Sequence, residues 1–450
     1  MDSGNVTLIM TLPESTLSAA TVQTRIRKRI VSAIVNYLSS LRQFSRNARL
    51  YLLGSFLMGV NFHTFQLLLN LYLKETGLAE GAIGSVISSR AVGMTLMALP
   101  AAIVFSRTRL KPALVVVSLL FALFSLGLIA ADSVNMLRLA SALTGGAFAF
   151  LFVASGPFFM RNSSKVERTH LFAASFGVMI LAGMIGSLGA GNMVDMLGRI
   201  AGNAADGYRY TMAGAIGLGL LSIIPFSLIK SSRPSKEEST ISLSLKQFRS
   251  RWRHYFRFSF ANFLLGMGAG LIIPFLNLYF KDRFHQSPSE IGSFYFAVQF
   301  SMLAGAMAGP VLAGRMGLVR TIVFTQLASI PFMLTLSHSY ILWLAAIAFV
   351  VRGGLMNLGV PIVTNFAMEM SEKQEQGLMN ALLKISWTSA WMISAAVGGL
   401  CIEAYGYTTT MDIAVLLYLA SSAVFFVFFR QSETKGDGGS GWTMIRQNTV

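Results

Sequence analysis

The sequence predicts an all-α membrane protein of twelve transmembrane helices, arranged as two pseudo-symmetric six-helix bundles. Of its 450 residues, 54% are hydrophobic and only 12% are charged, and the mean hydropathy is +0.61. Soluble globular chains average about 25% charged residues, so this composition is typical of an integral membrane protein.

The chain also repeats itself at long range. The segment LNLYLK at 69–74 returns as LNLYFK at 276–281. Three further positions return in the same order: Gly191, Asp195 and Gly198 correspond to Gly399, Glu403 and Gly406. Two similar sets of spans are typical of secondary transporters whose site lies between the halves.

Twelve apolar stretches come close to the ~20 residues that a spanning helix needs. They cover residues 50–74, 82–105, 112–131, 134–160, 169–195, 210–229, 257–280, 289–313, 318–337, 340–368, 377–402 and 408–430. The chain therefore divides into five parts: an N-terminal basic segment (1–49), a first six-helix bundle (50–229), a linker (230–256), a second bundle (257–430) and a flexible tail (431–450).

The N-terminal basic segment has a helical pattern of its own. Ile30, Ile34, Leu38 and Leu41 recur at helical spacing among basic residues. This pattern fits either an amphipathic helix on an anionic membrane surface or a disordered basic leader.

Lys and Arg are distributed unevenly between the two sides of the spans. With the N-terminus inside, the inner segments hold 27 Lys and Arg and the outer segments hold 5. The positive-inside rule then places both termini in the cytoplasm, and we expect a multi-pass protein of a bacterial inner (plasma) membrane. The formal charge of +17 does not indicate nucleic-acid binding, because the basic residues lie in short segments between apolar runs.

No pattern of an enzyme is present in the sequence. A P-loop motif is absent, and the five His and one Cys lack metal-ligand spacing. Cys401 is the only cysteine, so no intrachain disulfide can form. We expect no enzymatic activity, no cofactor and no metal, with a small-molecule substrate and the lipid bilayer as the partners.

Cationic side chains occur inside the predicted spans, where a charge costs about 2.5–3.5 kcal/mol on insertion scales. Arg352 lies near the middle of the tenth span, Arg90 lies in the second and Lys384 in the eleventh. They could bind an anionic substrate group in a cavity, lock helices by bonding to carbonyls, or, for the shallow Lys384, extend to the membrane surface. The sequence leaves these explanations open.

The first span carries a polar stripe made of Asn61, His63, Gln66 and Asn70. The last three recur at steps of three and four residues, so they share one helix face. Such a face meets either a cavity or a partner helix, and we predict a cavity. Further polar or aromatic residues expected to line it lie in later spans: Asn277, Gln299, Asn357 and Trp387.

Two loops carry a motif that resembles the major facilitator superfamily. The chain reads GPVLAGRMGLVR at 309–320, and a more degenerate copy, FSRTRLK, lies at 105–111. The resemblance covers nearly all of residues 49–430 and implies two six-helix bundles around a central cavity.

The resemblance implies a role for these loops in changing conformation. The motif residues that match are Arg107, Arg109, Gly309, Arg315, Gly317 and Arg320. The acid of the family's motif is replaced by Ser106 and Gly314. The arginines therefore either bond to carbonyls at helix C-termini or only set the topology.

The fifth span contains GMIGSLGAG at 183–191, which resembles the glycine-rich motif of superfamily exporters. Residues 352–357 and 377–380 resemble bacterial members classed as drug-efflux-like. The resemblance implies a monomer that exports small amphipathic or hydrophobic compounds by alternating access. Two alternatives are kept: an organic-anion transporter that uses Arg90 and Arg352, and a non-transporting sensor on a transporter scaffold.

Coupling to protons by antiport is left open. Proton-driven members of the superfamily usually place a carboxylate in span one, four or seven, and this sequence has none there. His63 in the first span is able to titrate near neutral pH, but it is equally suited to a helix contact.

Overall fold

A computed structural model describes residues 44–163, 165–230, 251–372 and 375–432. The helices and short turns of this part of the chain confirm the predicted all-α fold. The predicted amphipathic helix, most of the linker and nearly all of the tail lie outside the described residues.

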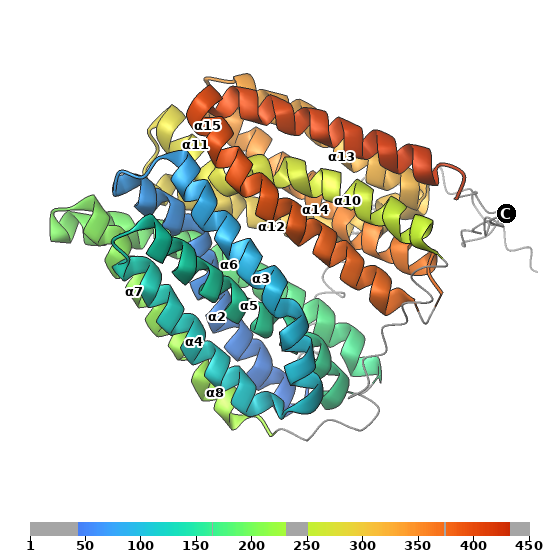
Figure 1. The fold of residues 1–450 in the computed structure, drawn as a ribbon, viewed down its shortest axis with the longest axis horizontal. Helices are drawn as coiled ribbons and strands as arrows, with labels where there is room; N and C mark the ends of the chain where they lie inside the picture. The colour runs from blue at the N-terminus through green and yellow to red at the C-terminus, as the bar shows by residue number, and fades with distance from the viewer. Residues whose placement is uncertain (1–43, 164, 231–250, 373–374, 433–450) are drawn as a thin grey trace, which may run out of the picture.

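The chain forms two groups of helices that lie side by side (Figure 1). The first group comprises α2 (Arg46–Glu75), α3 (Glu80–Arg107), α4 (Leu110–Ala130), α5 (Val134–Asn162), α6 (Lys165–Ala201), α7 (Ala204–Leu220) and α8 (Ile223–Leu228). The second comprises α10 (Trp252–Ile272), the 3-10 turn η2 (Ile273–Phe275), α11 (Leu276–Phe284), α12 (Pro288–Met316), α13 (Leu318–His338), α14 (Leu342–Glu369) and α15 (Gln376–Phe429).

The described residues contain 11 helices that are long and apolar enough to cross a membrane, one fewer than the sequence predicts. The difference lies in α15, which contains both of the last two predicted spans. Its path turns at Gly406, where φ is 78° and ψ is 175°, so that its two arms form a hairpin (Figure 1). Glycine tolerates this positive φ because it lacks a Cβ.

Pro274 interrupts the helix that follows the linker. The regular α-helix α10 ends at Ile272, η2 contains Pro274, and α11 continues from Leu276. A proline has no backbone N–H and its ring collides with the preceding turn, so the α-helical hydrogen-bond pattern cannot continue through it. The break releases backbone carbonyls next to the first bundle.

The two ends of the bundles differ in how they meet. We call the end where α8 stops at Leu228 and α10 starts at Trp252 the linker end. The opposite end, where α2 stops and α3 starts, is the gate end. One apolar cluster near the gate end contains side chains of both bundles, including Leu71 and Leu278. Toward the linker end each bundle has a separate apolar core. The bundles therefore share a core at the gate end and separate toward the linker end.

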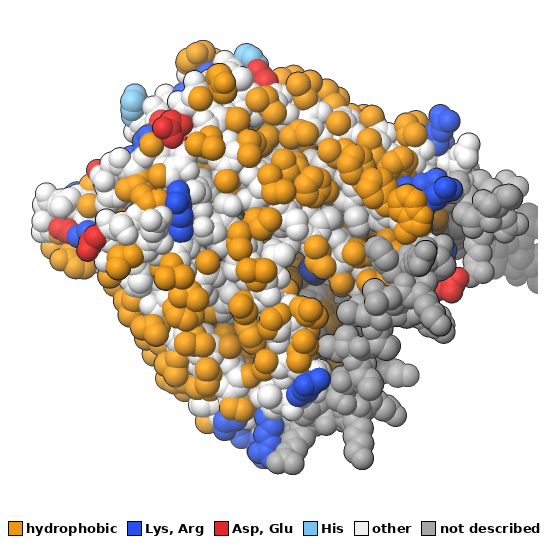
Figure 2. Space-filling model, in the orientation of Figure 1, with side chains coloured by type: hydrophobic (Ala, Val, Ile, Leu, Met, Phe, Trp, Pro, Cys, Tyr) orange, Lys and Arg blue, Asp and Glu red, His pale blue; other side chains and the backbone are white. Residues whose placement is uncertain are grey.

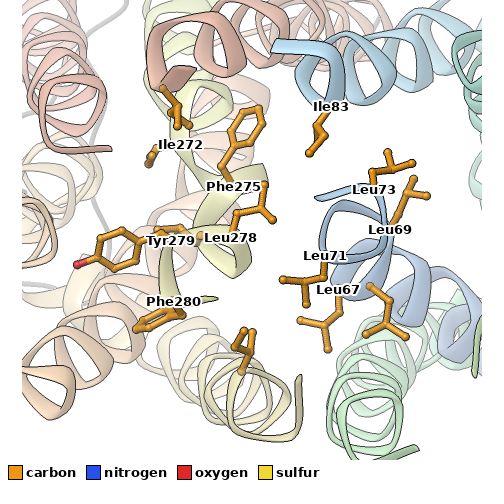
Figure 3. Close-up of a cluster of buried hydrophobic side chains, with 14 of the residues drawn as sticks. Leu67, Leu69, Leu71, Leu73, Ile83, Ile272, Phe275, Leu278, Tyr279 and Phe280 are labelled. Carbon is orange, nitrogen blue, oxygen red and sulfur yellow. The ribbon is translucent and has the colours of Figure 1, made fainter. Parts of the chain in front are cut away.

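Figure 3 shows this shared core from within. Leu67 and Leu71 of α2 extend toward the side of α11 that carries Leu278. Each of these three side chains is at most 1% exposed. Burial of a leucine side chain is worth about 1.5–3 kcal/mol, although lipid competes for such groups in a membrane. The gate end is therefore stabilised by close packing of the two bundles.

Small residues at repeat-related positions allow this close packing. A Cβ on Gly84 of α3 would lie 2.6 Å from the carbonyl oxygen of Ala395 and 3.0 Å from Cα of Gly399 in α15. A Cβ on Gly292 of α12 would lie 2.5 Å from a backbone oxygen of α6. Each contact is closer than a side chain allows, so these glycines set the distance between the bundles.

Replacing Gly84 with valine should open the gate end. Overpacking of this kind costs about 1–3 kcal/mol, and each 1.4 kcal/mol changes a population ratio about tenfold. Spin labels at Ile200→Cys and Tyr405→Cys, in a Cys401→Ser background, would report the separation of the bundles by double electron–electron resonance. Gly189→Val is the matched control, because a Cβ there meets no atom within 4 Å. An unchanged distance distribution in Gly84→Val would contradict the packing argument.

Candidate functional site

Two repeat-related asparagines join the bundles at the gate end. Nδ2 of Asn70 donates to the carbonyl of Pro274, and Nδ2 of Asn277 donates to the carbonyl of Leu67 at 2.7 Å. The Pro274 carbonyl is accessible because the N–H of Leu278 donates to the side chain of Asn277 instead. Both asparagines are predicted cavity residues, and in this conformation both lie in the closed contact between bundles.

Two repeat-related acids bond across the same interface. Oδ2 of Asp195 in α6 accepts from the N–H of Ser289 at 3.0 Å, and Oε2 of Glu403 in α15 accepts from the N–H of Gly81 at 2.9 Å. These N–H groups belong to the first turns of α12 and α3. The positive end of a helix macrodipole stabilises an anion there. Each bundle therefore contributes one carboxylate and receives the other.

Charged side chains surround this pair of contacts. Lys281 of α11 bonds to Glu75 of α2, and its Nζ lies 5.6 Å from the ring centroid of Tyr208 in α7. Lys74, the repeat counterpart of Lys281, bonds to Glu80 within the first bundle. The sequence repeat identified these positions, but their pairing across the bundles depends on the packing.

Farther from the gate end, Arg90 of α3 packs against α2 within the first bundle. Its guanidinium carbon is 4.5 Å from the ring centroid of Phe62 in α2, and that ring stacks on Phe148 of α5 at 3.9 Å. Nη2 of Arg90 is buried and has no hydrogen-bond partner among the described residues. A buried donor without a partner carries a desolvation cost of about 1–3 kcal/mol or more, which a bound anion would relieve.

The ring of His63 lies 5.3 Å from that of Phe62, against which Arg90 packs. Gln66, three residues further along α2, has an exposed side chain. A Cβ on Gly183 of α6 would lie 2.4 Å from Nε2 of Gln299 and 3.2 Å from Cε1 of His63. The predicted glycine-rich span therefore lets α2, α6 and α12 converge at one place.

A second cation reaches across the space between the bundles. Nζ of Lys384 in α15 lies 4.5 Å from the ring centroid of Phe152 in α5. Phe152 is one helical turn after Phe148, which stacks on Phe62, so the two phenylalanines are about 6 Å apart along α5. Trp387 lies on the same face of α15 as Lys384 and packs partly against Gly266. We name these residues the central site: Phe62, His63, Gln66, Arg90, Phe148, Phe152, Gln299, Lys384 and Trp387.

The surface is hollowed between the bundles next to the grey segments (Figure 2). Hydrophobic side chains cover much of the remaining face in this view. Over the described part of the chain, many large apolar side chains are more than half exposed, including Leu139, Leu416 and Val427. Such coverage suits contact with lipid. The apolar cores of the two bundles are separate toward the linker end, which agrees with a hollow between the bundles.

Arg352 is placed differently from Arg90. Its side chain is 2% exposed, its Nη2 donates to the hydroxyl of Tyr418 at 2.5 Å, and its guanidinium carbon lies 5.4 Å from the Tyr418 ring centroid. Both residues belong to the second bundle. In this conformation the contacts of Arg352 therefore join α14 to the second arm of α15.

Two other predicted cavity residues contact helices of their own bundle. Asn61 is 1% exposed and faces α7, where a Cβ on Gly219 would lie 2.5 Å from its Nδ2. Asn357 donates to the carbonyl of Gly353 in its own helix. In this conformation both belong to packing within a bundle.

The loop residues lie at the linker end. Arg107, Arg109, Arg315 and Arg320 are exposed, Gly309 packs on α14, and Gly317 has a φ of 92° between α12 and α13. At this end, Arg161 of α5 donates to the carbonyl of Phe105, in the last turn of α3, at 2.7 Å. The sequence did not single out Arg161.

The two-bundle architecture and its repeat match a known family. The family model of the Major Facilitator Superfamily matches residues 51–259 and again 258–449. The chain belongs to the major facilitator superfamily. No protein with a curated description matches the sequence.

Solved structures of other superfamily members have the same fold. The nucleoside transporter NupG is 15% identical, with a TM-score of 0.70 over 86% of this chain and 100% of that chain. A bacterial homologue of the human lysosomal transporter Spinster, inward-facing and unoccupied, is 13% identical, with a TM-score of 0.72 over 85% and 96%. The human organic anion transporter MFSD10 is 16% identical, with a TM-score of 0.60 over 84% and 99%.

This superfamily member has residues in its site that sequence reasoning missed. Phe62, Phe148 and Phe152 are not distinguishable in sequence from the many other aromatic residues of the spans. Asp195 and Glu403 were visible as a repeated pair, although nothing in the sequence indicated which helices they face. Among the described residues, no group of three or more His, Cys, Asp or Glu could hold a metal ion.

Removing the charges of Asp195 and Glu403 should weaken the closed gate end. Asp195→Asn and Glu403→Gln keep an acceptor oxygen but lose the anion, which is worth about 0.3–1 kcal/mol at a helix N-terminus. In the double variant, the ratio of separated to closed bundles, read from the spin-label distances, should rise about tenfold. Asp206→Asn, at the same end but without a contact across the bundles, is the control; an equal shift in that variant would contradict a specific role.

Removing the hydroxyl of Tyr418 should destabilise the second bundle. Tyr418→Phe leaves the buried Arg352 without its acceptor, at a cost of about 1–3 kcal/mol. The purified variant should have a lower apparent Tm, whereas Tyr405→Phe should not, because Tyr405 is 69% exposed. An unchanged Tm in Tyr418→Phe would indicate that Arg352 has another partner in the dominant conformation.

Proposed function

We propose that this protein is a secondary active transporter for small organic anions that carry an apolar or aromatic body. The single observation that carries this proposal is the Arg90 guanidinium, which lies against Phe62 with a buried donor that lacks a partner. Lys384 adds a second cation in the central site. A guanidinium suits a carboxylate, sulfonate or phosphate group, because its donors form a planar fork.

The aromatic side chains of the central site favour a substrate whose remaining part is apolar or aromatic. Phe152 is 50% exposed, and Phe62 and Trp387 are partly exposed. A ligand that places its anionic group near Arg90 could therefore cover apolar surface along α5 and α15. Neutral amphipathic compounds, the export substrates implied by the sequence resemblance, are the second candidate, since the same aromatic surface suits them.

Transport would proceed by alternating access. In the proposed orientation the linker end faces the cytoplasm, in agreement with the basic residues that gather there, and the structure is the inward-open state. The gate contacts would break and the linker ends would approach when the site opens outward. Two similar bundles are suited to this exchange, because each can adopt the packing of the other.

Substitution of Arg90 tests the substrate class. Binding of 1-naphthalenesulfonate can be measured by the thermal stabilisation that it gives the purified protein. The affinity should fall about 10–100-fold in Arg90→Gln, since a hydrogen bond to a charged group is worth about 1.5–3 kcal/mol. Arg90→Lys should lose part of this affinity because it loses the fork. Lys111→Gln, an exposed change at the linker end, should have no effect.

The same variants separate the two candidate functions. Flux of 1-naphthalenesulfonate into proteoliposomes should fall in Arg90→Gln, and flux of the amphipathic cation ethidium should be absent in the parent. Ethidium flux that survives in Arg90→Gln, with no anion flux in the parent, would support the amphipathic exporter instead. A sensor would move neither compound.

A further inference from the structure

A second cavity lies in the first bundle at the gate end, away from the central site. Its volume is about 230 Å³, and it is bounded by the end of α2, the 131–133 segment, the start of α5, and α7. Its lining residues are Tyr72, Leu73, Thr76, Leu78, Ala131, Asp132, Ser133, Val134, Leu137 and Arg209. We name it the gate-end pocket. Drug-sized ligands occupy about 300–1,000 Å³, so this pocket suits a smaller group.

Opposite charges lie on the walls of this pocket. Nε of Arg209 donates to the hydroxyl of Tyr72 at 2.9 Å, and its Nη1 is 3.7 Å from Asp206. The Arg209 side chain is 49% exposed, which leaves its outer edge accessible. Asp132 is exposed and close enough to interact electrostatically with Arg209. A ligand in the pocket would therefore meet a guanidinium on one side and a carboxylate on the other.

The second bundle contains the same framework with the space filled. The hydroxyl of Tyr72 bonds to the carbonyl of Ile129, and that of its repeat counterpart Tyr279 bonds to the carbonyl of Leu336. Four residues after the tyrosines, Thr76 of the first bundle corresponds to Arg283 of the second. Four residues after the bonded carbonyls, Ser133 corresponds to Tyr340. The guanidinium carbon of Arg283 lies 4.2 Å from the ring centroid of Tyr340.

The comparison gives a physical reason for the gate-end pocket. Where the second bundle has a stacked arginine and tyrosine, the first has the much smaller side chains of Thr76 and Ser133. The fold therefore does not require an empty space here, since the second bundle has the same framework and fills that space with side chains. A pocket of this kind accommodates a ligand in place of the missing side chains.

We propose that the gate-end pocket binds a zwitterionic group, with its anion against Arg209 and its ammonium against Asp132. Phosphate next to ammonium, as in phosphoethanolamine, has this chemistry, and it occurs both as a free solute and as a lipid headgroup. Met136 and Leu139, near the start of α5, are 60% and 61% exposed. They provide an apolar surface for an attached acyl chain.

Binding to purified protein in detergent tests this site with two probes, free phosphoethanolamine and dioleoylphosphatidylethanolamine. Native mass spectrometry counts bound molecules and gives relative affinities. Arg209→Gln and Asp132→Asn should each weaken binding about tenfold or more. Thr76→Arg combined with Ser133→Tyr, which copies the filling of the second bundle, should abolish it. Arg199→Gln is the control, because that exposed arginine bonds to the carbonyl of Asp195 in its own helix.

The measurements are made in the parent and in Arg90→Gln, so that failure of the central site and failure of this site are distinguished. Binding that persists in Arg90→Gln and is lost in Asp132→Asn would support the gate-end pocket. Asp132 is exposed, so this variant keeps its fold even if Arg209→Gln does not. Binding of the free compound would identify a solute site, and binding of the lipid alone a headgroup site. Unchanged binding in Asp132→Asn and the filled variant, or no binding of either probe, would overturn the proposal.

Discussion

The contact between the two bundles at the gate end is the constraint on which the rest of the structure depends. Four of its hydrogen bonds form two repeat-related sets, one made by Asn70 and Asn277 and the other by Asp195 and Glu403. Their partners are backbone groups: the carbonyl at the proline break, the carbonyl of Leu67, and an N–H at each of two helix N-termini. In each of these bonds only one partner is a flexible side chain. Gly84 and its repeat counterpart Gly292 let the helices approach closely enough for these bonds. Because this end is closed, the space between the bundles opens toward the linker end.

The central site has the opposite character. The Asn70, Asn277, Asp195 and Glu403 side chains at the gate end all have partners, whereas Arg90 has a buried donor without one, and Lys384 contacts the face of an aromatic ring. A protein accepts such a cost where a ligand or a second conformation supplies the missing partner. Arg352 also has a buried donor without a partner, its Nε, but its Nη2 is paired with Tyr418 inside the second bundle. The organic-anion proposal therefore rests on Arg90.

The internal repeat also explains where the two halves differ. Tyr72 and Tyr279 make equivalent hydrogen bonds, yet the neighbouring space is a pocket in the first bundle and is filled by Arg283 and Tyr340 in the second. Equivalent frameworks with unequal side chains are a way for one half to acquire a site without changing its fold. The gate end would then combine a structural contact with a ligand-binding surface.

The sequence by itself determined the all-α class, the family and the two-bundle organisation, because apolar length and the internal repeat can be read along the chain without knowing which helices meet. It also identified Arg90, His63 and Gln66 as polar residues within spans. Only the tertiary structure decided which of them meet. Helix rotation and the tilt of one bundle against the other place Asn70 and Asn277 in the gate, Asn61 against α7, and Arg352 against Tyr418. The aromatic partners of Arg90 and Lys384 come from other helices, and contacts between helices depend on packing that no single span encodes.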